Sequence, residues 1–221
     1  MMGLHLPDGP LRVLAVGAHC DDIEIGAGGL LRRLVRERPG TSVGALVLTS
    51  TPERGAETTA ALSALLDPVV PAVTLCGLRD GRLPAHFDEV KDALAEVAGQ
   101  PWDLVLAPHA EDAHQDHALV GALAPTALRD HLVLHYEIPK WDGDLGRLAP
   151  NLYLPLTTED LETKWALLDA HYPSQRSHDW WLRETFLGLA RLRGMECRSD
   201  YAEAFRMTKG VIHLTTTRET P

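Results

Sequence analysis

The sequence has few cysteines, no long hydrophobic run and a shortage of basic residues. Only three of its 221 residues are cysteine, an odd and widely spaced set, so a disulfide framework is not expected and the reducing cytoplasm is the simplest setting. No apolar stretch approaches the roughly 18 residues of a membrane-spanning helix, and the first ten residues have no basic region followed by an apolar core, so we expect no secretion signal. Lys and Arg number 21 against 31 Asp and Glu, a net charge of −10, which argues against nucleic acid and stable membrane association.

What the sequence does have is a regular alternation of short apolar runs and longer amphipathic stretches. The periodicity predicts strands at 12–18, 42–49, 69–75, 103–107 and 131–136, and helices at 25–36, 53–66, 87–98 and about 117–129. A long irregular segment follows, and then helices at 158–170 and 180–193 and a closing strand at 204–214. We therefore expect an α/β fold: a Rossmann-like, mostly parallel sheet with helices on both faces, in a single domain spanning residues 1–221.

Polar side chains gather directly after two of the predicted strands. GAHCDDIEIGAGG, residues 17–29, follows the first strand, and PHAEDAHQDH, residues 108–117, follows the strand at 103–107. In open parallel sheets, ligands bind at the carboxyl ends of the strands, because loops and helix N-termini converge there. We therefore expect these two loops to meet.

Three of these side chains, His19, Asp22 and His117, suit a catalytic zinc site, which has three protein ligands and a fourth position for water. His19 and Asp22 are three residues apart across a strand-to-helix turn, so both can point into one pocket while Asp21 faces elsewhere. Each signal alone has a blander interpretation: the adjacent aspartates could cap a solvated helix, and His114 with His117 could begin a polar one. The two patterns together favour a site for Zn²⁺ or another divalent ion.

The two motifs resemble those of the LmbE-like, or PIG-L, family of zinc-dependent de-N-acetylases. AHCDD is similar to the family's AHPDD and is followed by IEIGAGG, while PHAEDAHQDH is similar to its PHxxDxHxDH. Two later segments agree with family patterns and are supportive only: Lys164 with Tyr172, Ser174 and Gln175, and YAEAF at 201–205. The resemblance covers nearly the whole chain and implies an LmbE-like fold. Cys20 stands where the family usually has proline, and we interpret it as a turn filler.

The resemblance also implies roles for individual residues. It makes the three candidates above the zinc ligands, Asp21 the general base, and His114 the residue that stabilises the oxyanion or protonates the leaving amine. Asp116 would orient His114, and Arg54 would contact the substrate.

Further substrate contacts are expected from the residues that follow the strand at 131–136. Glu137, Lys140 and Trp141 combine polar groups with an aromatic ring, which suits a sugar, although a solvated loop with a core tryptophan explains them equally well. Weaker candidates are Gln175, Arg176, His178 and Glu184. We interpret four histidines as surface or structural residues: His5, His86, His131 and His213.

These expectations together predict a metal-dependent hydrolase that removes the N-acetyl group from an N-acetylated amino sugar or sugar conjugate, a small-molecule substrate. Two alternatives stay open: an amidase that cleaves a larger acyl group from a sugar–thiol conjugate, and a non-enzymatic Rossmann-like binding module. The second lacks the GxGxxG that would directly follow the first strand. The sequence leaves the oligomeric state open, a homo-oligomer included.

Overall fold

The protein is built on one mixed sheet that begins at the first predicted strand. The computed structural model describes residues 3–139, 143 and 148–212. Its strands are β1 (Arg12–Gly17), β2 (Ser42–Thr49), β3 (Ala72–Leu78), β4 (Leu104–Pro108), β5 (Leu132–Tyr136), β6 (Leu152–Leu156) and β7 (Tyr201–Met207). They lie in the order β3-β2-β1-β4-β5-β7-β6, and β1 to β5 are mutually parallel while β7 runs antiparallel to both of its neighbours.

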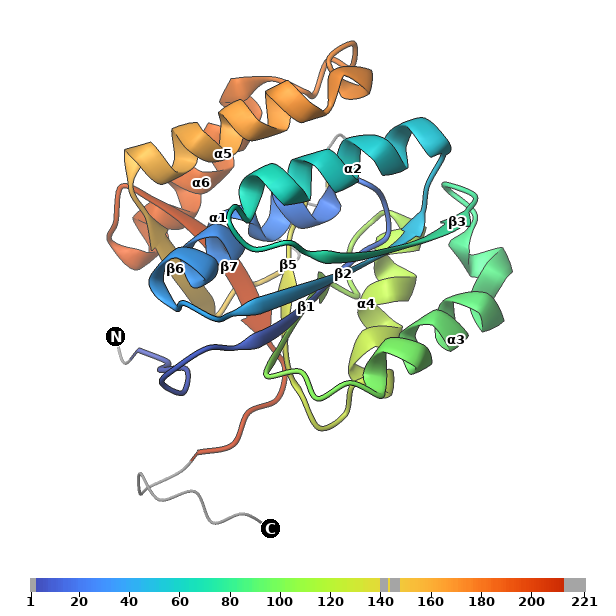
Figure 1. Ribbon diagram of the computed structural model, residues 1–221. Coiled ribbons are helices and arrows are strands. Elements are labelled where there is room, and N and C mark those ends of the chain that lie inside the picture. Colours follow the sequence, from blue (N-terminus) through green and yellow to red (C-terminus); the bar gives the residue numbers. More distant parts are fainter. Residues whose placement is uncertain (1–2, 140–142, 144–147, 213–221) are drawn as a thin grey trace.

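Helices cover both faces of this sheet (Figure 1). They are α1 (Asp22–Glu37), α2 (Pro52–Leu65), α3 (Phe87–Ala98), α4 (Gln115–Ala127), α5 (Thr158–His171) and α6 (Arg183–Cys197), with short 3₁₀ turns at Leu83–His86 and Pro173–Gln175. One core lies between the sheet and α1, α2, α5 and α6, and a second lies between the sheet and α3 and α4. Alternate β1 residues feed the two cores, since Val13 and Ala15 pack in the first and Leu14 and Val16 in the second.

The predicted fold class is confirmed: the sheet is mostly parallel and carries helices on both faces. The predicted elements are all present, most within three residues of their expected ends. The exceptions lie late in the chain. The segment expected to be irregular contains β6, and β7 ends at Met207 rather than near residue 214. No helix in the described part of the chain is long and apolar enough to cross a bilayer.

Two glycines allow the helices that carry the polar motifs to pack closely on the sheet. A Cβ atom on Gly26 of α1 would overlap the ring of Tyr136, whose hydroxyl donates to the carbonyl of Val16 (2.7 Å). A Cβ atom on Gly121 of α4 would overlap the backbone at His109. Any larger residue would therefore push the helix away from the strand ends.

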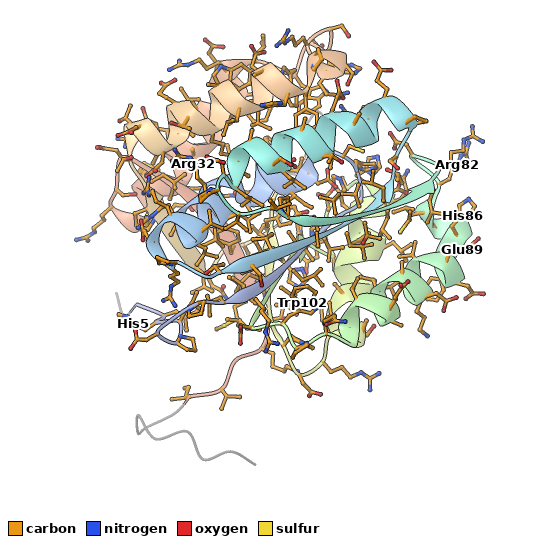
Figure 2. All side chains as sticks on the ribbon, in the orientation of Figure 1. His5, Arg32, Arg82, His86, Glu89 and Trp102 are labelled. Atoms are coloured by element: carbon orange, nitrogen blue, oxygen red, sulfur yellow. The ribbon has the colours of Figure 1, made fainter. Side chains whose placement is uncertain are left out.

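Two of the histidines interpreted as surface or structural lie outside the polar motifs that follow β1 and β4. His5 lies on the exposed N-terminal segment, and His86 lies at the outer end of α3 beside Glu89 (Figure 2).

Candidate active site

The loops after β1 and β4 meet, because these two strands are neighbours in the sheet. His19 Nδ1 lies 3.0 Å from His117 Nε2, and Asp22 Oδ1 lies 3.2 Å from His117 Nε2 and 3.5 Å from His19 Nδ1. Three donor atoms from two loops that are distant in sequence thus form one small triangle. Asp22 and His117 are buried, and His19 is partly exposed.

This triangle fits a metal ion. Ligand atoms about 2.0–2.1 Å from a tetrahedral zinc ion lie about 3.3–3.4 Å apart, close to the three separations observed. The nitrogens of His114 also fall in the group, since ring nitrogens of His19, His114 and His117 lie within 4.8 Å of one another. A second such group joins His19 to Asp80 and Asp116.

Hydrogen bonds hold each candidate ligand in place. Asp22 Oδ2 accepts from the backbone N–H groups of Ala18 (2.8 Å) and His19 (2.9 Å), which leaves Oδ1 facing the histidines. His117 Nδ1 lies 2.9 Å from Asp112 Oδ2. A carboxylate in that position holds a proton on Nδ1, so the lone pair of Nε2 points to the centre of the triangle.

The electrostatics of the cluster favour a positive charge at its centre. Burial opposes protonation of His19, but the carboxylates of Asp22, Asp116 and Asp80 outweigh it and hold the pKa of His19 well above its ordinary value. Burial likewise disfavours the carboxylate of Asp22, yet His117 and His19 hold its pKa well below the usual range. Either a proton or a bound metal ion can supply this positive charge.

Arg54 contacts the residue predicted to be the base. Its Nη2 lies 3.1 Å from Asp21 Oδ2, while Nη1 lies 3.2 Å from Glu57 Oε2 and donates to Ser174 Oγ (2.9 Å). The guanidinium also lies over the ring of Tyr172, 5.4 Å from its centroid. Arg54 therefore lines the pocket, but its charge is directed at Asp21 and Glu57.

The structure places Asp116 differently from the expectation that its carboxylate orients His114. That carboxylate accepts from the backbone N–H groups of Gly81 (2.7 Å) and Leu83 (3.0 Å), and Oδ2 lies 3.3 Å from His19 Nε2. It is instead the backbone N–H of Asp116 that donates to His114 Nδ1 (3.3 Å). The sequence could not reveal this, because the N–H groups that bind the Asp116 carboxylate belong to the loop after β3, which is distant in the sequence.

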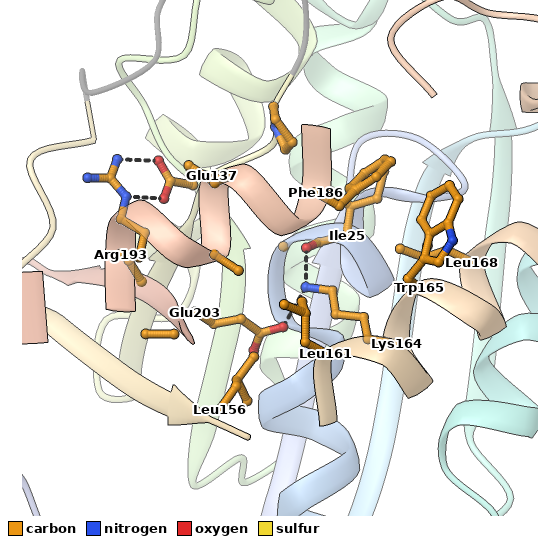
Figure 3. Close-up of a pocket in the computed structure, with 16 residues that line it drawn as sticks. Ile25, Glu137, Leu156, Leu161, Lys164, Trp165, Leu168, Phe186, Arg193 and Glu203 are labelled. Atoms are coloured by element: carbon orange, nitrogen blue, oxygen red, sulfur yellow. Dashed lines mark hydrogen bonds and ion pairs between the residues drawn. The ribbon is translucent and has the colours of Figure 1, made fainter. Parts of the chain in front are cut away.

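Glu137 does not face the candidate ligands as a free substrate contact. Arg193 Nε and Nη2 donate to its two carboxylate oxygens at 2.6 and 2.7 Å. This ion pair borders a different, small pocket (Figure 3). The predicted sugar contact at Glu137 stays a prediction, and its carboxylate is already paired with Arg193. Lys140 and Trp141, predicted with it, lie outside the described residues.

A cavity of about 560 Å³ opens beside the candidate ligands. Its walls are formed by His19, Asp21, Asp22, Ile25, Arg54, Asp80, His114, Gln115, Ile138, Gln175, His178 and Trp180. Asp80 and Trp180 were not among the residues predicted from the sequence. Asp80 follows β3, and the rule that ligands bind at the carboxyl ends of strands would have indicated it had that strand been predicted to end at Leu78.

The supportive sequence motifs form a layer behind the site. The hydroxyl of Tyr172 contacts the carbonyl of Cys20 (2.5 Å) and donates to Glu24 Oε1 (2.7 Å). Burial raises the pKa of Glu24 to about 8. Lys164 Nζ donates to the carbonyl of Ile25 and to Glu203, both at 2.6 Å (Figure 3). These contacts fix the turn and the helix that carry Asp21 and Asp22.

Comparisons with known proteins agree with this geometry. The sequence model of the PIG-L family, described as GlcNAc-PI de-N-acetylase, matches residues 14–128, which is more than half of the chain. An uncharacterized deacetylase of Escherichia coli, YaiS, is 29% identical over 175 residues, covering 72% of this chain and 89% of that protein.

Solved structures share the fold. The N,N'-diacetylchitobiose deacetylase of Pyrococcus horikoshii aligns with a TM-score of 0.70 and 21% identity over 89% of this chain and 83% of its own. The conserved protein TT1542 of Thermus thermophilus aligns with a TM-score of 0.67 and 26% identity, over 94% of this chain and 99% of its own. GalB, a 4-carboxy-2-hydroxymuconate hydratase of Pseudomonas putida, aligns with a TM-score of 0.71 and 18% identity, over 94% of this chain and 100% of its own. The fold thus occurs in proteins that are named for different reactions.

Proposed function

Because this chain belongs to the PIG-L family, we propose that it is a metal-dependent hydrolase that removes the N-acetyl group from an N-acetylated amino sugar or sugar conjugate. The observation that carries the proposal is the convergence of His19 Nδ1, Asp22 Oδ1 and His117 Nε2 within 3.0–3.5 Å of one another. The names of the Escherichia coli and Pyrococcus horikoshii relatives, both deacetylases, support the reaction.

These three residues would hold the metal ion, which we propose to be Zn²⁺, with other divalent ions as alternatives. A bound zinc ion supplies a Lewis acid that polarises the amide carbonyl and makes a water molecule more acidic. The ligand set of two imidazoles and one carboxylate is typical of catalytic zinc sites.

Asp21 is proposed as the general base. Its carboxylate is buried beside the pocket, and Arg54 Nη2 lies 3.1 Å from its Oδ2 and holds it in position. A base in a fixed position contributes about 10²- to 10⁴-fold to the rate. Asp21 would take the proton of the attacking water and can later return it.

His114 is proposed as the group that faces the developing oxyanion and the leaving amine. Its Nδ1 accepts the backbone N–H of Asp116, so the proton of a neutral ring lies on Nε2. A preorganised donor of this kind contributes about 3–4 kcal/mol to transition-state stabilisation. Asp116 thus acts on His114 through its backbone, while its carboxylate holds the loop after β3.

The free cysteines and the extent of the sheet bear on the compartment and the domain organisation of the protein. The cysteines Cys20, Cys76 and Cys197 are unpaired, which suits a cytoplasmic enzyme with a small-molecule substrate. One sheet includes strands from Arg12 to Met207, so we take the chain to be a single domain. Nothing in this proposal depends on the oligomeric state.

Purified protein tests the proposal through metal analysis and a panel of N-acetylglucosaminides assayed for free amine. We expect about one divalent ion per chain and release of acetate and amine in equal amounts. Asp21→Asn should keep the metal and lose turnover, whereas His117→Ala should lose both. His86→Ala, at a partly exposed histidine just before α3, is the matched control and should keep both. Equal metal loss in Asp21→Asn and His117→Ala would contradict the division between base and ligand.

The same assay separates the alternatives. Turnover of bulky N-acyl groups without turnover of acetyl groups would support the amidase. A protein with neither bound metal nor turnover would support the binding module.

A further inference from the structure

The cavity beside the candidate ligands carries more negative than positive charge. Asp21, Asp22 and Asp80 present carboxylates to it, and Arg54 is the one Lys or Arg among its described lining residues. On the basis of the proposed function, we infer that the substrate is an uncharged N-acyl sugar. It carries no phosphate, sulfate or carboxylate on or next to the acylated ring.

The charge of Arg54 is already compensated. Carboxylate oxygens of Asp21 and Glu57 lie 3.1 and 3.2 Å from its two terminal nitrogens, and the side chain is 19% exposed. An anion that paired with Arg54 would have to displace one of these carboxylates into a mostly buried setting, which costs more than an exposed ion pair returns. Arg54 can donate a hydrogen bond to a hydroxyl, but it offers no free positive charge.

Asp80 adds an exposed negative charge at the mouth of the cavity. Its side chain is 77% exposed, and Oδ1 lies 3.1 Å from His19 Nε2. Because Asp80 lines the cavity and contacts a proposed metal ligand, a substrate in the cavity lies within about one Debye length of this carboxylate, which is about 8 Å at physiological ionic strength. An anionic group on the sugar would be repelled on entry and when bound.

A bound divalent ion does not reverse this balance. Asp22 would ligate the ion, and the carboxylates of Asp112 and Asp116 lie directly behind the ligand histidines, at 2.9 Å from His117 Nδ1 and 3.3 Å from His19 Nε2. The positive charge of the metal is therefore matched by the carboxylates of Asp22, Asp112 and Asp116, and Asp80, which also contacts His19, adds a further negative charge to the cavity.

The rest of the cavity wall suits a neutral, hydroxylated ring. Ile25, Ile138 and Trp180 provide apolar surface, and Gln115 and Gln175 provide amides. A cavity of about 560 Å³ lies in the range of small-molecule sites. The family's description names GlcNAc-PI, a substrate that carries a phosphate group. The charges in this chain argue that its own substrate lacks one.

Three sugars test the inference: methyl N-acetylglucosaminide, its 6-sulfate, and N-acetylglucosamine 1-phosphate. We expect kcat/KM to be at least about tenfold lower for the two anions than for the neutral glycoside at about 0.02 M salt. Raising the salt to about 0.5 M should increase kcat/KM for the anions and leave the neutral sugar unchanged, since screening removes only the repulsion. The sulfate binds metals weakly, so its result separates charge repulsion from chelation.

Variants assign the effect to the cavity. Asp80→Asn should reduce the gap between neutral and anionic sugars about threefold. Asp92→Asn, which removes an equal charge from the exposed face of α3, should leave the gap as it is. An anion preferred over the neutral sugar, or equal turnover of all three without salt dependence, would overturn the inference and leave the deacetylase function standing. Absence of amine release from every sugar would instead overturn the proposed function and the inference with it.

Discussion

The carboxylate of Asp112 decides which nitrogen of His117 faces the metal position. Oδ2 of Asp112 lies 2.9 Å from Nδ1 of His117, and both side chains are buried. Carboxylates that hold ligand histidines in this way set the tautomer and the orientation of the ring and increase its basicity.

Asp112→Asn should weaken zinc binding by about 10- to 100-fold without unfolding the protein. The amide can still accept from Nδ1 but carries no charge, so the ring becomes a poorer ligand. Competition with a chromogenic chelator measures the affinity. Glu111→Gln, an exposed neighbour in the same loop, is the matched control and should bind zinc as the unaltered chain does. Equal affinity in Asp112→Asn would contradict this role.

At the level of single residues, some contacts could be predicted from the sequence and others could not. His19, Asp22 and His117 were brought together by their positions at the ends of parallel strands, a rule that needs no coordinates. Glu137 obeys the same rule, but its pairing with Arg193, 56 residues away on α6, was not predicted. A pairing between distant elements leaves no periodic signal in the sequence.

The middle of α1 is bonded to side chains from two other elements. Glu203 of β7 accepts from the backbone N–H groups of Gly29 and Leu30, both at 2.7 Å, and Lys164 of α5 donates to the carbonyl of Ile25 at 2.6 Å. Lys164 and Glu203 are themselves paired at 2.6 Å and buried. The ion pair therefore ties α1 to α5 on the same face of the sheet and to β7 within the sheet.

Glu203→Gln should lower the free energy of unfolding by about 3–5 kcal/mol, because it leaves the Lys164 charge buried without its carboxylate. Urea unfolding followed by circular dichroism measures the change. The double variant Lys164→Met with Glu203→Gln removes the stranded charge and should recover part of the loss. A double variant no more stable than Glu203→Gln would contradict the explanation by an unpaired charge.

The N-terminus of α5 is closed by a capping box. Thr157 Oγ1 accepts from the backbone N–H of Asp160 (3.1 Å), and Asp160 Oδ2 accepts from that of Thr157 (3.2 Å). Burial alone would raise the pKa of Asp160, but the hydrogen bonds from Thr157 and the charges of Arg36 and Arg33 hold that pKa below its ordinary value. The carboxylate therefore stabilises the folded state only while it is charged.

Asp160→Ala should lower the free energy of unfolding by about 1 kcal/mol at neutral pH. Because the pKa is lower in the folded state, this contribution is complete above the unfolded value of about 3.9 and is lost as the pH falls through the folded one. Urea unfolding across a pH series should show a constant difference down to about pH 5 and a shrinking one below about pH 4. A difference that persisted at the lowest pH would contradict the role of the charge.

There is a physical reason why β6 was not predicted from the sequence. β6 contains Pro155, which removes a backbone donor, and its residues mix aromatic and apolar side chains without alternation. It is an edge strand, paired only with β7, so one side of its backbone needs no partner. Edge strands tolerate the residues that mark a loop elsewhere. Its neighbourhood in the sheet, not its sequence, makes it a strand.

Across the whole molecule, the site joins two parts of the chain that the sheet brings side by side. Alternating strands and helices predicted the parallel sheet, but the adjacency of β1 and β4 depends on the order β3-β2-β1-β4, which several topologies with the same elements would not share. A ligand shared by these loops therefore stabilises the native arrangement as a whole.

Removal of the metal should lower the Tm of the entire protein in one transition. An ion that binds only the folded state at about 100 times its Kd adds about 2.7 kcal/mol, which corresponds to about 5–10 °C for a chain of this size. Thermal unfolding with increasing Zn²⁺ after chelator treatment measures the shift. Asp21→Asn should retain it and His117→Ala should lose it, because only the second removes a ligand that spans the two loops. An equal rise of Tm in His117→Ala would place the stabilising ion at another site.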